Sequence, residues 1–214
     1  VDPDGFNRFY YPNGQVSSEG YLRNGQPDGY WKTYFENGSL KSEGNRIDFL
    51  LYSTWTFYDE NGNKTLEVNY KAGMKEGKRF TYRENETIEE NFSNDIKQGQ
   101  TIYYYLDNRI FRIINFENGL EEGMAKEYAD DGRVILITTY RKGFLISRER
   151  INRLDSEGRK QGHWKFFHKN GLVKLEGFYL NDLKNGFFKE YDSAGKLVEA
   201  TKWLKGEIQE QAEE

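Results

Sequence analysis

The sequence contains no cysteine, only three prolines and no long apolar run. The lack of cysteine excludes disulfides, thiolate metal sites and a cysteine nucleophile, although it does not identify a compartment. A membrane-spanning helix needs about 18 or more apolar residues in succession, and none occurs. Residues 1–6 do not resemble a signal peptide. Since the chain begins with valine, we expect that an upstream segment was removed or omitted, which leaves cytoplasmic and exported locations open.

Charge and composition narrow the function classes further. The 31 basic and 35 acidic residues give a net charge of -4, so the chain lacks the overall positive charge that is typical of a general nucleic-acid binder. Only 36% of the residues are hydrophobic, and the mean hydropathy is -0.94, so a thick aliphatic core is excluded. The 16 Tyr, 15 Phe and 4 Trp are nevertheless too many for a disordered chain. We therefore expect a folded chain with a thin, aromatic core.

Glycine, in contrast, is abundant, and its positions reveal an internal repeat. Repeats of about 24 residues begin at eight positions: Gly5, Gly29, Ser53, Gly77, Gly99, Gly123, Gly162 and Gly186. An aromatic residue lies five positions after every origin: Tyr10, Tyr34, Tyr58, Tyr82, Tyr104, Tyr128, Phe167 and Tyr191. Asn-Gly pairs at 13–14, 37–38, 61–62 and 170–171 separate an aromatic run from an aliphatic run, which is a strong hairpin signal. The repeat therefore predicts an all-β, elongated antiparallel meander of about eight hairpins.

These columns resemble the bacterial variant of the MORN repeat. Its pattern is a glycine, an aromatic residue two positions on, a tyrosine, Asn-Gly, an apolar residue and often Glu-Gly. Residues 29–44 and 162–177 match it closely, whereas the repeats at Gly77 and Gly99 lose the Asn-Gly turn. The resemblance implies hairpin architecture rather than chemistry. Some bacterial members are described as antitoxin components, and eukaryotic MORN proteins are linked to scaffolding and phospholipid contact, so the resemblance implies an antitoxin-like scaffold.

One interruption breaks the period between Gly143 and Gly162. We interpret residues 1–146 as a first array, residues 147–206 as a second array that continues the first, and residues 207–214 as an acidic tail that could form a short helix over the last sheet edge. A hinge would lie in segment 147–161. The alternative is a long surface loop or an added hairpin inside one sheet.

Both faces of the predicted strands carry aromatic residues, and a single-layer sheet cannot bury both faces unless it curls. We predict that the strict aromatic column forms the core by stacking between repeats. Large aromatic residues on the other face are candidate anchors for a protein partner, with burial as the alternative. These candidates are Trp31, Trp55, Phe57, Trp164 and Phe166.

Positive charge is concentrated between Arg141 and Lys165, a segment that contains eight basic residues and three acidic ones. The candidate basic patch within it comprises Arg148, Arg150, Arg153, Arg159 and Lys160. Such a patch could meet an acidic protein or anionic lipid headgroups, as in a cell-envelope or membrane-surface module. Solvated loop charge is the simpler account.

Residues suited to catalysis or metal binding are sparse. His163 and His168 are the only histidines, and their spacing places them on opposite strand faces. No nucleophile elbow or phosphate-binding loop motif occurs. We therefore predict no catalytic residues, no metal and no cofactor, and expect a non-catalytic scaffold whose partner is a protein of unknown identity.

Overall fold

The computed structural model describes residues 1–209, which form β-strands joined by turns, without a helix among them. Residues 210–214 of the predicted acidic tail lie outside the described part, whereas Glu207 and Ile208 form a short strand. The chain divides into two compact units. The first unit comprises residues 1–123 and 140–144, and the second comprises residues 124–139 and those from 145 onward.

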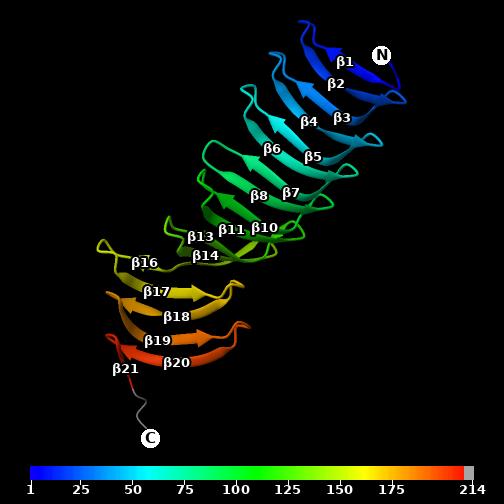
Figure 1. Cartoon of the computed structure of the whole chain (residues 1–214). Helices are drawn as coiled ribbons and strands as arrows, with labels where there is room; N and C mark the ends of the chain where they lie inside the picture. The colour runs from blue at the N-terminus through cyan, green and yellow to red at the C-terminus, as the bar shows by residue number, and fades with distance from the viewer. Residues whose placement is uncertain (210–214) are drawn as a thin grey trace. The chain divides into compact units, whose positions relative to one another are not determined.

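In the first unit, consecutive strands pair in chain order as antiparallel hairpins (Figure 1). The short strand β9 pairs with β8 beside the main path, and β12 pairs with β11. The strands are β1 (Phe6–Tyr10), β2 (Val16–Arg23), β3 (Gln26–Tyr34), β4 (Leu40–Ile47), β5 (Leu50–Tyr58), β6 (Lys64–Lys71), β7 (Met74–Tyr82), β8 (Thr87–Ser93), β9 (Ile96–Lys97), β10 (Gly99–Tyr104), β11 (Ile110–Glu117) and β12 (Leu120–Glu121).

The second unit holds most of three neighbouring strands and a separate six-stranded sheet. The three neighbours are β13 (Gly123–Tyr128), β14 (Val134–Arg141) and β15 (Phe144–Arg150). The separate sheet contains, in order, β16 (Arg153–Leu154), β17 (Lys160–Phe167), β18 (Val173–Leu180), β19 (Leu183–Tyr191), β20 (Leu197–Leu204) and β21 (Glu207–Ile208). The prediction of an all-β antiparallel meander of hairpins is confirmed.

Two kinds of turn alternate along the chain. At the Asn-Gly turns only the glycine has a positive φ, for example +83° at Gly14, while the asparagine does not. Both central residues have positive φ at the other turns, for example Asn24 and Gly25. The Asn-Gly asparagine instead joins repeats, because the Asn13 amide donates to the Glu36 carbonyl oxygen in the next repeat at 3.0 Å.

Large aromatic rings are buried on one face of the sheet because they lie over glycines of neighbouring strands. Trp31 is paired across the strands with Gly20 on β2 and with Gly44 on β4. A Cβ atom at Gly44 would lie 2.5 Å from the Trp55 ring, and one at Gly20 would lie 2.0 Å from the Trp31 ring. Only glycine leaves room for the ring to lie flat on the sheet. The Glu-Gly element of the repeat is thus a packing requirement.

In five of the eight repeats, the tyrosine of the strict aromatic column lies on the opposite face and forms a hydrogen-bond ladder rather than a stacked core. Tyr128 and Phe167 of the same column do pack against a buried cluster. In the ladder the hydroxyl donates to a glutamate 15 residues earlier, as Tyr34 does to Glu19 at 2.6 Å and Tyr58 does to Glu43 at 2.8 Å. The same bond recurs between Tyr82 and Glu67, Tyr104 and Glu89, and Tyr191 and Glu176. Basic residues such as Arg8, at 2.7 Å from Glu19, complete the charge balance. The column therefore links consecutive repeats through charge-assisted bonds.

The repeats that begin at Gly77 and Gly99 keep the strand pairing but change the core. Arg79 occupies the position that Trp31 and Trp55 hold in earlier repeats, and it pairs across the strands with Val68 and Glu90 in place of glycines. Glu90 is buried and accepts an ion pair from Lys97 at 2.6 Å. Loss of the tryptophan thus coincides with loss of the glycine that accommodates it.

Gly44→Ala tests the ring-over-glycine packing. The new methyl group would overlap the Trp55 ring, and overpacking of this kind costs about 1–3 kcal/mol of unfolding free energy. Urea unfolding measures the loss, with Asn45→Ala as the control because Asn45 is the exposed neighbour on the same strand. Equal stability of the two variants would show that the ring does not need the glycine.

Tyr34→Phe tests the ladder through pH. The hydrogen bond from Tyr34 is the largest cause that lowers the Glu19 pKa below its ordinary 4.5, so the variant should raise this pKa, as measured by NMR titration of the carboxyl carbon. In the native chain the Glu19 contribution to stability is present above pH 4.5 and is lost as pH falls through the lowered pKa. An unchanged Glu19 titration in the variant would contradict the ladder.

The tyrosine side of the same pair acts at high pH. Burial, followed by the bond to Glu19, raises the Tyr34 pKa from 10.0 to about 12. The Tyr34 contribution is therefore fully present below pH 10 and is lost as pH rises towards 12. Unfolding free energies measured across this range should fall more steeply for the native chain than for Tyr34→Phe.

Candidate functional site

The structure does not expose the tryptophans that were predicted as partner anchors. Trp31, Trp55 and Trp164 are only 7%, 3% and 4% exposed. Phe57 and Phe166 are half-buried and pack against the same clusters, with ring centroids 6.3 Å from Trp55 and 6.0 Å from Trp164 respectively. The prediction of exposed tryptophan anchors is wrong, because the facing glycines let the rings sink onto the sheet.

Segment 147–161 contains the end of β15, the short strand β16 and a turn, and it joins the two sheets of the second unit. Ile151 is fully buried with Val134 and Ile137. The Asn152 amide donates to the carbonyl oxygens of Val134 at 2.9 Å and Lys165 at 3.0 Å, and its oxygen accepts the Lys165 N–H at 2.7 Å. This one side chain therefore bonds to β14 and to β17.

The predicted basic patch divides into two groups in the structure. Arg148, Arg150 and Arg153 line a groove of about 390 Å³ in the second unit, together with apolar side chains and Glu127. None of the three arginine side chains makes a hydrogen bond or ion pair with another described residue. Guanidinium groups therefore outnumber carboxylates three to one along the groove.

The remaining two members of the patch are engaged elsewhere. Arg159 pairs with Asp155 and Glu157, both at 2.9 Å. The Lys160 ammonium lies 4.9 Å from the Tyr179 ring centroid and 5.3 Å from that of Trp164, where its stem covers the aromatic core. These two residues therefore serve the fold locally.

Glu149, although it lies between two groove arginines in sequence, is bound by the opposite sheet. It accepts a bond from Lys165 at 2.7 Å and contacts His163 at 2.5 Å. Burial alone would raise the Glu149 pKa, but the bonds from Lys165 and His163 outweigh it and hold the pKa below its ordinary value. Glu149 is thus an ionised partner of β17 and is not bonded to the arginines.

A second surface was not found from the sequence. In the first unit, Leu50, Met74, Ile96 and Leu120 occupy equivalent positions at the start of successive hairpin strands, and each is 42–50% exposed. We call these four residues the apolar row. The Leu50 side chain reaches to 3.5 Å from the Cβ position of Gly73, and Ile96 to 3.8 Å from that of Gly119, so each side chain lies beside the next turn. The apolar column three residues before the origin was the signal that could have revealed the row.

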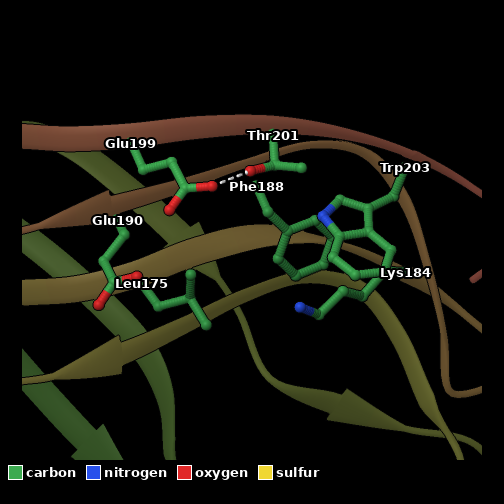
Figure 2. Close-up of a pocket in the computed structure, with 7 residues that line it drawn as sticks. All are labelled: Leu175, Lys184, Phe188, Glu190, Glu199, Thr201 and Trp203. Atoms are coloured by element: carbon green, nitrogen blue, oxygen red, sulfur yellow. Dashed lines mark hydrogen bonds between the residues drawn. The ribbon is translucent and has the colours of Figure 1, made fainter. Parts of the chain in front are cut away.

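A third feature is the aromatic pocket of about 220 Å³ near the end of the second sheet, shown in Figure 2. Phe188 and Trp203 meet edge to face, and Glu190 and Glu199 lie at the rim. The Lys184 ammonium lies 4.1 Å from the Trp203 ring centroid, so the chain already supplies a cation to the rings. We interpret this pocket as packing of the last repeat.

The described residues provide no group of three or more His, Cys, Asp or Glu side chains suited to a metal ion. In the same part of the chain, no helix is long and apolar enough to cross a membrane.

Comparison with known families identifies part of the repeat. The model of the MORN repeat variant family matches residues 4–24, 27–48, 52–72 and 160–181, which are the repeats with the Asn-Gly turn. The matched ranges cover fewer than half of the residues. No curated protein matches the chain. MORN repeats suggest a repeat scaffold, and such scaffolds often bind a membrane or a protein.

Asn152→Ala tests the joint between the sheets. The substitution would leave backbone groups of Val134 and Lys165 without their hydrogen-bond partner. Each such group should lower the free energy of unfolding by about 1–3 kcal/mol. Urea unfolding of the second unit, followed by hydrogen exchange in β17, measures the loss. Asn24→Ala is the control, since Asn24 has a similar φ of 50° in an exposed turn. A loss no larger than that of the control would show that the joint depends on backbone conformation alone.

Proposed function

We propose that this chain is a non-enzymatic repeat scaffold that binds another protein through the apolar row of its first unit. The observation that carries the proposal is the exposure of Leu50, Met74, Ile96 and Leu120 at equivalent positions in four successive hairpins. Isolated exposed apolar residues are ordinary, but a continuous series on one edge is typical of an interaction surface.

The row has dimensions that suit a protein partner. Equivalent residues in adjacent repeats are two strands apart, which is about 10 Å, so four residues span about 30 Å. Charged residues border the row: Lys75 follows Met74, and the Asp95 side chain accepts the Lys75 N–H at 2.9 Å. An apolar centre with a polar border is the usual anatomy of a protein interface.

The perturbed ionisable groups support a non-enzymatic role. The tyrosines with strongly raised pKa values and the glutamates with lowered pKa values belong to the ladder between repeats, where structural bonds account for the shifts. They are spread along the sheet and do not converge on one cavity. A catalytic site requires such groups to meet around a reacting atom.

An antitoxin-like role is the finer form of this proposal, and it rests on the family resemblance. In that case the partner would be a toxin that the scaffold blocks. The captured partner should then arrest growth when it is expressed alone, and coexpression with this chain should restore growth. Contact with anionic lipid was the alternative predicted from sequence, but Arg159 and Lys160 of the basic patch are engaged within the fold.

Replacing Leu50, Met74 and Leu120 with serine tests the proposal. Affinity capture from source cells would identify a stoichiometric partner, and titration of the purified partner should show about tenfold or weaker binding to the variant. The control replaces Phe6, Leu106 and Ile110, which are exposed residues of the same unit outside the row. Equal binding by both triple variants, or no partner for the native chain, would contradict the proposed function.

A further inference from the structure

We propose that β15 is an open sheet edge to which an acidic, extended segment of a partner protein adds as a strand, with carboxylates that pair with Arg148, Arg150 and Arg153. The inference rests on the proposed protein-binding function, but it concerns a different surface and a defined partner chemistry. Strand addition combines main-chain hydrogen bonds, which supply affinity, with alternate side chains, which supply specificity.

The position of β15 leaves one of its edges open. It is the terminal strand on its sheet path, and the next strand, β16, belongs to the other sheet. Nearly every residue of β15 is exposed, including Leu145 at 61% and Ile146 at 56%. An exposed edge strand with apolar side chains is a template for pairing with another chain.

The hydrogen bonds at the end of β15 show which backbone groups point outward. The Ile151 N–H donates to the Ile135 carbonyl oxygen of β14 at 3.0 Å, whereas the Asn152 N–H donates to the His163 carbonyl oxygen of β17 at 2.9 Å. Because successive residues of a strand alternate in direction, the N–H and C=O groups of Arg148 and Arg150 point away from β14. These groups would pair with an added strand.

Charge selects the kind of strand. Arg148 and Arg150 are two residues apart and share a strand face, which matches the period of alternate side chains on an added strand. With Arg153 they line the groove, and the three side chains have no hydrogen bond or ion pair within the described part of the chain. Glu149 does not neutralise them because Lys165 and His163 hold it. Guanidinium groups bind carboxylates through two parallel hydrogen bonds, so the complementary segment is acidic.

Two other occupants fit less well. A second copy of β15 that pairs about Arg148 or Glu149 would place arginines opposite arginines, and like charges across strands are destabilising. The same positive charge that disfavours pairing between two copies of β15 favours the addition of an acidic strand. The headgroups of a lipid surface could pair with the arginines, but they would leave the outward backbone groups of β15 without partners. The concave groove and the open ladder together favour a peptide segment.

The test uses the full chain and a fluorescent, end-blocked peptide of alternating Glu and Val, with an alternating Lys and Val peptide for comparison. Anisotropy titrations at low and physiological ionic strength measure binding. Hydrogen exchange at Arg148 and Arg150 measures strand addition directly. The variant Arg148→Glu/Arg150→Glu removes the charge, and Lys174→Glu/Lys189→Glu is the control, because these exposed lysines carry the same charge change outside the groove.

A further variant, Arg148→Gln/Arg150→Gln, removes the positive charge without reversing it and gives a second test of charge if the glutamate variant disturbs folding. We expect the acidic peptide to bind, to slow exchange at the two edge amides, and to bind about tenfold or more weakly to the glutamate and glutamine variants than to the control. The lysine peptide should not bind.

The proposal would be overturned by peptide binding that is insensitive to these variants or that leaves the edge amides unprotected. It would also be overturned if phosphatidylglycerol-containing vesicles bind through the arginines and the peptide does not, or if sedimentation of the chain alone shows dimers in which the edge amides are protected. Failure of the peptide while a native partner still binds the apolar row would overturn this inference alone. Peptide binding without any such partner would overturn only the proposed function.

Discussion

The contact between a large aromatic ring and a glycine on the neighbouring strand is the constraint on which the rest of the structure depends. A single-layer sheet has no second layer to cover its core, so its apolar side chains must lie flat to escape water. Trp31, Trp55 and Phe188 do so because Gly20, Gly44 and Gly177 leave no Cβ atom beneath them. The 24-residue repeat places each ring and its glycine in register, and one hairpin thereby supports the next.

The opposite face is organised by polar contacts, and this division determines where function can reside. Tyrosine hydroxyls and glutamate carboxylates join successive repeats there. The surfaces that we propose for binding lie at the edges: the hairpin ends that carry the apolar row, and β15, where the first sheet path ends. The first sheet path ends at β15 because the Asn152 side chain, at the position where the next strand of the repeat would otherwise follow, bonds to both sheets.

Sequence periodicity predicted much of the fold, because glycine, Asn-Gly and aromatic columns are local signals of hairpins. It did not predict which face buries the tryptophans, since parity alone cannot show that Gly44 makes room for Trp55. The arginines at 148, 150 and 153 were identified from charge density, whereas their separation from Arg159 and Lys160 depends on ion pairs and ring contacts between strands. The apolar row was missed because its members are 22 or 24 residues apart and resemble ordinary strand residues. The division of the chain at residues 146 and 147 stays a prediction.

The most direct test of the account is hydrogen exchange on the chain with and without its native protein partner. If the edges are the functional surfaces, protection should appear at the hairpin ends around Leu50, Met74, Ile96 and Leu120. Exchange near the buried rings of Trp31 and Trp55 should remain unchanged. Protection confined to the Asn-Gly turns or to the central parts of the strands would contradict the claim that this scaffold binds through its edge.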